Sequence, residues 1–465
     1  MDQAIRKKYV YWEWRTIIVL MIGYAFYYFV RKNFSIAMPA MEASLGITKV
    51  QLGLFLTLNG IIYGISRFTN GILADRYSRR KLMTAGLVLS GIVNLLICFS
   101  PKMNGVMNML DTEGKATMSL VYVIGSLWVI NGYLQGMGVP PCQSLLAHWI
   151  KPSELATKQS IWNASHSIGA GLVSVLCGFL LKHFGYSAWQ LCFAVPAIIA
   201  ILGAAVIWFG VKDNPSSVGL PEIEELEKEG NVESAGFQVN EDEAVKGAAF
   251  KKLVNKMVFG NPLIWILAVS NFCIYVIRFT ILDWGTSILT QYKSIGIATA
   301  GTVVGLAEMV GGILGMLVAG WVTDRYLKSK AHRTCFICTV CATVTFILFW
   351  KCTSVWAVIL FDILTSFFIY GPQALLGTCA SMQATKRAAA TANGILGMFG
   401  YASTAVSGLL FGFLSQNYGW DRVFMVATIF GIAGAIVIAF MWNAPADGYA
   451  KADRIMADVK SDSQL

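Results

Sequence analysis

Long apolar stretches alternate with short polar links along almost the whole chain. Most of the apolar stretches have about 20 residues or more, the length that an α-helix needs to cross the hydrocarbon core of a bilayer. Backbone groups inside a membrane must be satisfied internally, which favours helices over open sheets. The pattern therefore predicts an all-α polytopic membrane protein. We expect twelve spans at residues 16–39, 51–74, 82–100, 119–147, 158–181, 188–211, 262–290, 297–322, 334–351, 355–380, 388–414 and 423–443.

One long hydrophilic segment interrupts this pattern between the sixth and seventh spans. Residues 212–257 include an acidic run at 221–229 and a further acidic triplet at 241–243. A polar segment of this length indicates a solvated linker between two bodies. We therefore expect an N-terminal six-helix half at 1–211, a cytoplasmic linker at 212–257 and a C-terminal six-helix half at 258–465.

The two predicted halves repeat one another. Asp75 and Arg76 end the second span, and Asp324 and Arg325 end the eighth, each pair within a Gly-x-x-x-Asp-Arg-Tyr pattern and at an offset of 249. An arginine inside span one also repeats in span seven, at an offset of 247. Two features that share an offset this closely indicate a duplicated six-helix unit. We expect the four charged residues at the span ends to act as gating latches.

The charge distribution gives an orientation. The chain has a formal net charge of +10, but only 13% of its residues are charged, about half the usual share in a soluble protein. When Lys158 and Lys351, at the edges of their spans, are counted with the adjacent links, the predicted inner links hold 25 Lys and Arg residues and the outer links hold 7. Such a bias places both termini in the cytoplasm. Because the basic residues lie in links between spans, the positive charge does not indicate a nucleic-acid partner.

A few charged residues lie inside the spans. A cation at the bilayer centre costs roughly 2.5–3.5 kcal/mol on insertion scales, so such residues usually face a cavity and meet an anion. The cations outnumber the acids by one, which favours an anionic ligand. The intramembrane cations are Arg31, Lys32, Arg67 and Arg278, and the acids are Asp283, Glu308 and Asp362.

Arg31 and Arg278 occupy corresponding places in the two repeats. A planar guanidinium can form bidentate, charge-assisted hydrogen bonds with a phosphate, whereas lysine offers only a point charge. The pair therefore predicts a phosphate clamp. The alternative is that each arginine forms a structural ion pair within its bundle.

The neighbours of the two arginines include tyrosines. Helical spacing places Tyr24 and Tyr28 on the face of Arg31, and Tyr275 on the face of Arg278. We expect a polar lining, with simple packing as the alternative.

Two further residues have open roles. His166 lies in a Gly-rich span and can be a cavity donor or a satisfied packing group. Arg67 can extend the cationic lining or snorkel to the surface.

The acids suggest a switch. We expect Asp283 and Glu308 to pair with Lys32 or with the arginines when no ligand is bound, and to be released when phosphate takes the arginines. Which acid pairs with which cation stays open. For Asp362 a helix-packing role is equally compatible with the sequence. No nucleophile–base set or metal cluster stands out, so we expect neither an enzyme nor a cofactor.

Residues 71–81, with the weaker copy at 320–330, resemble the loop signature of the major facilitator superfamily. The blocks at 23–34, 135–142, 162–166, 271–284 and 370–372 resemble those of the organophosphate:phosphate antiporters, and the resemblance covers roughly 16–443. It implies alternating access and exchange of inorganic phosphate for glycerol 3-phosphate or a hexose 6-phosphate. It also implies a multi-pass protein of the bacterial inner membrane, and the duplication suggests a monomer.

The resemblance also assigns site residues. The family's phosphate-binding arginines match Arg31 and Arg278, its site histidine matches His166, and its lysine in span two matches Arg67. Its site tyrosines match Tyr24, Tyr28, Tyr63, Tyr275, Tyr370 and Tyr401.

The chain departs from both branches of the family. Val139 stands where the glycerol-phosphate branch often has Trp, and Asn393 and Leu396 stand where the hexose-phosphate branch can carry Asp and Lys. By its place in this resemblance, Asn393 is expected to contact the substrate. The intact block at 135–142 and the apolar Leu396 favour glycerol 3-phosphate slightly. The alternatives are a membrane sensor of sugar phosphate and a proton-coupled symporter of another organic anion.

Overall fold

The computed structural model describes residues 3–105, 108–150, 152–221, 254–327 and 330–448, together with 451 and 454. Apart from one isolated bridge between Leu110 and Ala116, the regular structure in these residues is helical. Twelve helical segments are long and apolar enough to cross a membrane, which confirms the predicted number of spans. The predicted linker 212–257 lies mostly outside the described residues.

The described chain divides into two compact units, each with its own internal packing. The first comprises Met1–Phe237 together with Gly285–Gly305, and the second comprises Gln238–Trp284 together with Leu306–Leu465. The predicted halves, with their boundaries at the linker, stay a prediction, and the segment 285–305 packs with the first unit.

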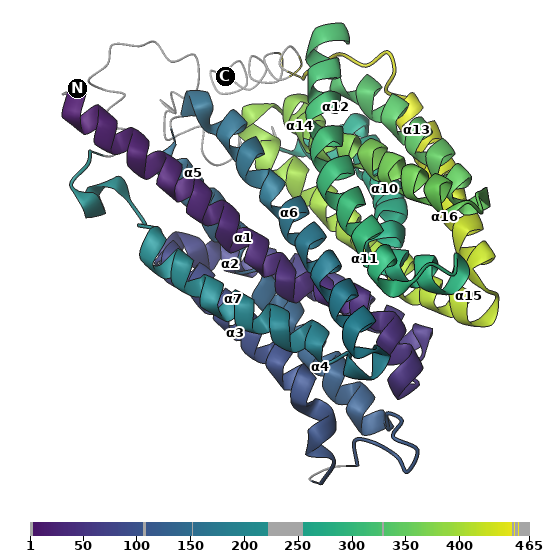
Figure 1. The fold of residues 1–465 in the computed structure, drawn as a ribbon. Helices are drawn as coiled ribbons and strands as arrows, with labels where there is room; N and C mark the ends of the chain where they lie inside the picture. Colours follow the sequence, from purple (N-terminus) through teal and green to yellow (C-terminus); the bar gives the residue numbers. More distant parts are fainter. Residues whose placement is uncertain are drawn as a thin grey trace. The chain divides into compact units, whose positions relative to one another are not determined.

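The first unit consists of long helices joined by short turns (Figure 1). Helix α1 packs against α6 and α7, α3 packs against α7 and α4, and α2 packs against α4 and α5. The elements are α1 (Gln3–Leu45), α2 (Lys49–Arg76), α3 (Arg79–Phe99), η1 (Ser100–Gly105), α4 (Met118–Gln135), α5 (Val139–Trp149), α6 (Pro152–Phe184), η2 (Tyr186–Ala188), α7 (Leu191–Gly210), η3 (Pro215–Val218), η6 (Ile288–Tyr292) and α11 (Ile297–Leu306).

The second unit is built around α14, which packs against α12, α13 and the short π-helices η5 and η7. Helix α13 also packs against α16. The elements are η5 (Asn255–Phe259), α10 (Pro262–Ser287), η7 (Ala307–Gly311), α12 (Gly312–Tyr326), α13 (Ala331–Lys351), α14 (Val355–Ala402), η8 (Ala405–Leu410), α15 (Phe411–Asn417) and α16 (Trp420–Ala439).

Several spans are interrupted where the sequence pattern shows one apolar run. Helix α1 bends at Val30, and α14 contains a break at Thr385 that separates the tenth span from the eleventh. The fourth span is interrupted between α4 and α5, where a side chain at Gly136 would collide with Ser66 of α2. Breaks in membrane helices are tolerated where protein surrounds the backbone, so these positions lie where helices meet rather than against lipid.

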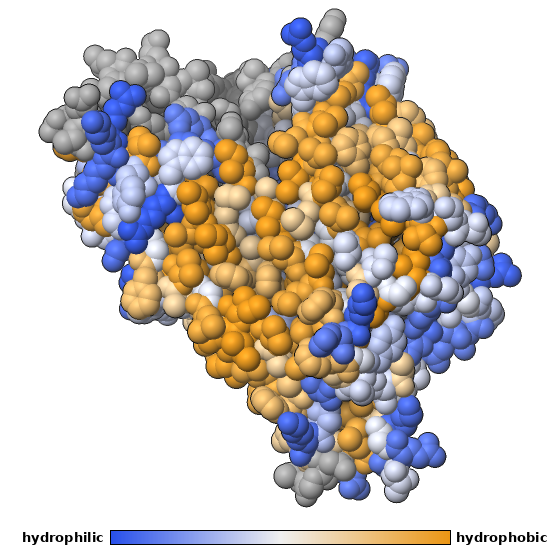
Figure 2. All heavy atoms as spheres, viewed as in Figure 1, coloured by the Kyte–Doolittle hydropathy of each residue, from blue (hydrophilic) through white to orange (hydrophobic). Residues whose placement is uncertain are grey.

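The surface agrees with a membrane environment. On the face in view, apolar side chains gather over the helices and hydrophilic ones gather toward helix ends (Figure 2). Exposed apolar residues include Leu202, Phe209 and Phe440, with 68%, 73% and 76% of their surface accessible. Apolar surface on this scale indicates contact with lipid, and we describe the chain as an integral multi-pass membrane protein.

Candidate functional site

The bend in α1 lies directly before Arg31. Val30 has non-helical dihedral angles (φ −103°, ψ 19°), and its carbonyl accepts hydrogen bonds from Asn131 Nδ2 at 2.8 Å and from Asn94 Nδ2 at 3.3 Å. Asn33 Nδ2 in turn donates to Asn94 Oδ1 at 2.9 Å. A carbonyl released from a membrane helix needs such a partner. The asparagines therefore fix the bend that sets the direction of Arg31.

Two tyrosine rings hold the Arg31 guanidinium. Its central carbon lies 3.9 Å from the ring centre of Tyr63 and 5.3 Å from that of Tyr28. Both distances are within the range of a cation–π interaction. The contact with Tyr28 confirms that these residues share a face of α1, and Tyr63 adds a ring from α2. The arginine is half-buried.

The aromatic wall continues toward α6. The ring centres of Tyr24 and Tyr28 are 5.5 Å apart, those of Tyr24 and Trp162 are 5.0 Å apart, and those of Tyr28 and His166 are 5.7 Å apart. Five of the residues that the sequence singled out therefore lie together in the first unit: Tyr24, Tyr28, Arg31, Tyr63 and His166.

His166 is buried, and its hydrogen bonds indicate which ring nitrogen carries the proton. Its Nδ1 lies within hydrogen-bond distance of the carbonyl oxygen of Asn163, and its Nε2 lies 3.4 Å from Ser167 Oγ. A carbonyl can only accept, so Nδ1 carries the proton and donates. The imidazole is thus packed and oriented by its own helix, and its predicted role as a cavity donor stays a prediction.

Two other cations of the first unit lie near this group in sequence. Lys32 is buried in α1 next to Arg31, with 8% of its surface accessible. Arg67 is half-buried in α2, one helical turn after Tyr63. The two roles predicted for Arg67 remain open, and the proposed exchange of partners by Lys32 stays a prediction.

In the second unit an arginine is held in the same manner. The Arg278 guanidinium carbon lies 5.1 Å from the ring centre of Tyr275, 5.5 Å from that of Phe279 and 5.3 Å from that of Tyr370. Tyr275 and Phe279 belong to α10, as Arg278 does, whereas Tyr370 belongs to α14. The arginine is buried, with 7% of its surface accessible. The contact with Tyr275 confirms their predicted common face, and Phe279 escaped the sequence analysis because a phenylalanine in a span ordinarily indicates packing.

A carboxylate joins this group through the tyrosine. The Tyr370 hydroxyl donates a hydrogen bond to Glu308 Oε2. Glu308 lies in the π-helix η7, an insertion that is common at functional sites. Asp283, one turn beyond Arg278 in α10, is buried as well. The sequence analysis selected all of these residues, but it did not show that Tyr370 lies between Arg278 and Glu308.

The last part of α14 faces α10. Asn271 Nδ2 donates to the carbonyl of Leu396 at 2.8 Å. A Cβ atom on Gly400 would lie 2.9 Å from the same nitrogen, so only glycine allows this approach. Tyr401 follows directly and is half-buried.

Asn393, by contrast, is engaged within α14. Its Nδ2 donates to Ser381 Oγ at 2.7 Å and to the carbonyl of Ala389 at 3.0 Å. Its predicted contact with substrate stays a prediction, to be made through the remaining amide oxygen.

The predicted gating residues lie at helix ends. Arg76 is exposed at the end of α2, and Asp324 and Arg325 are exposed at the end of α12. The side chain of Asp75 lies outside the described residues. Their role as latches stays a prediction.

Arg79, which follows Asp75 and Arg76 in the first charged motif, makes contacts that the sequence did not reveal. Arg79 donates from Nε to Ser144 Oγ at 2.7 Å, from Nη1 to Asn214 Oδ1 at 3.1 Å and from Nη2 to His148 Nε2 at 3.0 Å. These bonds tie the start of α3 to α5 and to the segment after α7. Arg79 of the motif therefore has a cross-linking role inside the first unit.

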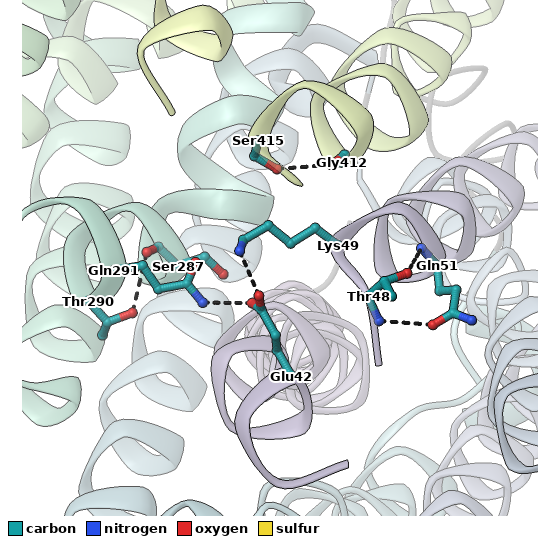
Figure 3. A network of polar contacts seen from close by, with 9 residues as sticks. All are labelled: Glu42, Thr48, Lys49, Gln51, Ser287, Thr290, Gln291, Gly412 and Ser415. Atoms are coloured by element: carbon teal, nitrogen blue, oxygen red, sulfur yellow. Dashed lines mark hydrogen bonds and ion pairs between the residues drawn. The ribbon is translucent and has the colours of Figure 1, made fainter. Parts of the chain in front are cut away.

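A second polar network lies at another end of the first unit (Figure 3). Glu42 of α1 accepts from Lys49 Nζ of α2 at 2.6 Å and from Gln291 Nε2 of η6 at 2.7 Å. Thr48 and Gln51 close a capping box at the start of α2 beside it. Two consecutive helices and a segment 249 residues further along the chain thus meet at one carboxylate.

Comparisons with known proteins agree with this architecture. A profile of the Major Facilitator Superfamily matches residues 20–403 and 286–459. The chain is 33% identical over 448 residues to a probable hexose phosphate transport protein of Chlamydia trachomatis, covering 95% of this chain and 93% of that one. It is 33% identical over 434 residues to the glycerol-3-phosphate transporter of Bacillus subtilis, covering 92% of each.

Two further similarities bear on function and on fold. The chain is 30% identical over 437 residues to the membrane sensor protein UhpC of Salmonella typhimurium, covering 93% of this chain and 92% of that one. The inward-open, partially occluded structure of the xylose transporter XylE from E. coli superposes with a TM-score of 0.68 at 15% identity. It covers 93% of this chain and all of that one. At this identity the structural likeness concerns the fold alone.

Proposed function

Because the chain belongs to the Major Facilitator Superfamily, among its organophosphate:phosphate antiporter-like members, we propose that it transports phosphorylated organic molecules across a membrane. More specifically, we propose that it exchanges inorganic phosphate for a phosphorylated organic substrate by alternating access. The proposed location is the bacterial inner membrane, with both termini in the cytoplasm, and the proposed working form is a monomer.

One observation carries the proposal. Each unit contains an arginine that is surrounded by aromatic rings inside the protein: Arg31 against Tyr63 and Tyr28, and Arg278 against Tyr275 and Tyr370. Arg31 and Arg278 are 247 residues apart, which is nearly the offset of 249 residues between the two repeated charged motifs. Rings restrain a guanidinium without neutralising it, so each arginine can still bind an anion. A phosphate offers the oxygens that two such forks bind bidentately.

The surrounding polar groups suit the rest of the substrate. In the first unit, the tyrosines supply hydrogen-bond donors whose rings are fixed by packing, and His166 supplies Nε2, which accepts in the neutral ring and donates in the protonated ring. A histidine can also follow the change in phosphate charge near neutral pH. We assign substrate contacts to Tyr24, Tyr28, Tyr63, Arg67, His166, Tyr275, Tyr370, Asn393 and Tyr401.

Alternation requires interactions that exchange. We propose that Lys32, Asp283 and Glu308 exchange partners when phosphate binds the arginines, and that the charged residues after the second and eighth spans stabilise one of the two closed states. Tyr370 supports an exchange of partners by Glu308. Its hydroxyl donates to the Glu308 carboxylate, and its ring contacts Arg278. Glu42 and its two partners form an additional latch that holds α1, α2 and η6 together.

For the organic substrate we propose glycerol 3-phosphate before hexose 6-phosphate. Leu396 offers no charge to a sugar, and its carbonyl is occupied by Asn271. Asn393 has its amide nitrogen bound to Ser381 and Ala389, which leaves one neutral acceptor. A smaller substrate needs fewer polar contacts on this side of the site.

Counterflow in liposomes tests the proposal. Vesicles containing the purified protein are loaded with inorganic phosphate, and labelled glycerol 3-phosphate or glucose 6-phosphate is added outside. We expect internal phosphate to accelerate uptake of glycerol 3-phosphate more than that of glucose 6-phosphate. Uptake that does not depend on internal phosphate for either substrate contradicts antiport. Vesicles loaded with sulfate of equal concentration control for a general anion effect.

A second candidate is a sugar-phosphate sensor, because one relative, matched over 92% of its length, is named a membrane sensor protein. A sensor would bind glucose 6-phosphate without counterflow. Binding measured by isothermal titration calorimetry, in protein that shows no exchange in the same liposome preparation, would favour the sensor.

A further inference from the structure

Two carboxyl groups lie deep inside the second unit, on elements that pack closely. Glu308 is 3% accessible and Asp362 is 1% accessible. Glu308 belongs to η7 and Asp362 to the first part of α14. A Cβ atom on Gly311 would lie only 2.7 Å from the carbonyl oxygen of Ile363, so glycine allows the two backbones to touch one turn from Glu308 and one residue from Asp362. Close backbone contact brings both acids into one electrostatic environment.

The hydrogen bonding of the two acids is unequal. Glu308 accepts the Tyr370 hydroxyl, and the Tyr370 ring contacts the Arg278 guanidinium. Asp362 Oδ2, in contrast, has no hydrogen-bond partner among the described residues. The charged group that the close contact between η7 and α14 places near Asp362 is the carboxyl of Glu308. Asp362 thus has a buried acceptor without a donor, and a negative neighbour.

Other charged groups on the packed elements lie at helix ends. Helix α13 presents thiols and threonines along its middle. The charged residues of the elements that pack against α14 are His332, Arg333 and Lys351 at the ends of α13, Asp324 and Arg325 at the end of α12, and Lys256 in η5.

We propose that Glu308 and Asp362 form a proton-binding site, in which Asp362 holds the proton while Glu308 remains the acceptor of Tyr370. An ionised carboxylate that is buried without a hydrogen bond is strongly unfavourable, and a second negative charge nearby adds to the cost. Binding a proton from water forms an O–H bond on Asp362 and removes both penalties. Its release returns the proton to water and leaves two carboxylates, which requires a nearby cation or a change of conformation.

The site connects to the substrate arginine through one tyrosine. Phosphate at Arg278 alters the charge that Tyr370 and Glu308 experience, and so alters the affinity of Asp362 for its proton. The transport rate should therefore change with pH as a single proton binds to or leaves Asp362. This consequence rests on the proposed function, whereas the existence of the proton site does not.

Infrared spectroscopy of the purified protein without substrate tests the site directly. A protonated carboxylic acid has a carbonyl stretch that is resolved from the bands of carboxylates and amides. We expect this band in the wild type near neutral pH, with loss of the band as the pH is raised. Asp362→Asn should abolish it. Glu308→Gln should keep it but move its disappearance to lower pH, because the negative neighbour is gone.

A matched control is Asp111→Asn, which removes an exposed carboxyl that accepts backbone hydrogen bonds in a turn. We expect no change in the band. Absence of the band in the wild type near neutral pH, or an equal band in Asp362→Asn, overturns the proton site. Asp362→Glu should restore a band at a shifted frequency if an acid at this position is what binds the proton.

Exchange measured as a function of pH tests the coupling separately. The wild-type rate should follow the infrared titration, and Asp362→Asn should remove that component of the pH profile. An unchanged profile in Asp362→Asn overturns the coupling even when the infrared result holds. Failure of all exchange in the wild type contradicts the antiporter and leaves the infrared result to stand on its own.

Discussion

Asn131 Nδ2 donates a 2.8 Å hydrogen bond to the carbonyl of Val30, the residue at which α1 bends immediately before Arg31. Asn131 of α4, together with Asn94 of α3, thus holds the backbone at the bend. The direction of Arg31, the proposed phosphate ligand, therefore depends on a residue a hundred positions away.

Asn131→Leu should therefore impair the site without contacting substrate. Leaving a buried acceptor without its donor costs about 1–3 kcal/mol, and α1 should straighten or shift. We expect a lower melting temperature and a weaker affinity for phosphate, measured by thermal unfolding in detergent and by calorimetry. Asn417→Leu, at an exposed helix end, is the matched control. Wild-type affinity in Asn131→Leu would show that the bend does not set the position of Arg31.

Replacing either substrate arginine by lysine should weaken phosphate binding while the protein still inserts. A charge-assisted hydrogen bond contributes about 1.5–3 kcal/mol, so Arg31→Lys and Arg278→Lys should each raise the Kd for phosphate roughly tenfold to a hundredfold or more. Arg422→Lys, on the exposed start of α16, should leave the Kd unchanged. Near-normal Kd values in both site variants would refute the phosphate clamp.

The ring of Tyr63 should matter more than its hydroxyl for Arg31. Tyr63→Phe keeps the face that lies 3.9 Å from the guanidinium carbon, whereas Tyr63→Leu removes it. A cation–π contact contributes about 0.5–2 kcal/mol, so the leucine variant should bind phosphate roughly 2- to 30-fold more weakly than the phenylalanine variant. Equal affinities of the two variants would assign the role to the hydroxyl.

The latch at Glu42 should control local opening of the first unit. Glu42→Ala removes the acceptor for both Lys49 and Gln291. We expect faster hydrogen–deuterium exchange in peptides that cover 49–51 and 288–292, measured by mass spectrometry, with little change in α13. Glu113→Ala, in an exposed turn, serves as the comparison. Identical exchange in Glu42→Ala and the wild type would mean that the network does not hold these segments together.

A buried ion pair at the start of α6 predicts a pH dependence of stability. Lys158 Nζ lies 2.5 Å from Glu13 Oε1 and also contacts Glu154. Burial alone would lower the pKa of Lys158, but the hydrogen bonds and charges of the two glutamates raise it above its ordinary value of 10.5. A raised pKa in the folded state means that the stabilisation is complete below the unfolded-state pKa and is lost as pH rises through the folded-state pKa.

Lys158→Met should accordingly lower the melting temperature near pH 8 and have a progressively smaller effect above pH 10.5. Thermal unfolding of both proteins across this range measures the difference. A deficit that stays constant into the alkaline range would mean that the loss arises from packing and not from charge. The exposed Lys182→Met provides the baseline for removing a lysine from the same helix.

The sequence by itself determined that the chain has twelve spans, whereas the linker and the repeat that it predicts stay predictions. A bilayer requires about 20 apolar residues for each helix, and this requirement is visible in the order of residues without any tertiary contact. The two arginines proposed to bind phosphate could be identified in the sequence for a related reason. A cation inside a span is costly, so Arg31 and Arg278 stand out wherever they point. Their companions Tyr28 and Tyr275 followed from helical spacing.

Only the tertiary structure decided what each charged residue contacts. Tyr63 approaches Arg31 from another helix, Tyr370 joins Arg278 to Glu308, and Gln291 reaches Glu42 across 249 positions. Such partners are separated along the chain, and nothing in local hydropathy specifies them. The bend at Val30 was hidden for the same reason, because residues 24–38 contain no glycine or proline that would mark it and the donor that stabilises the bend lies on α4.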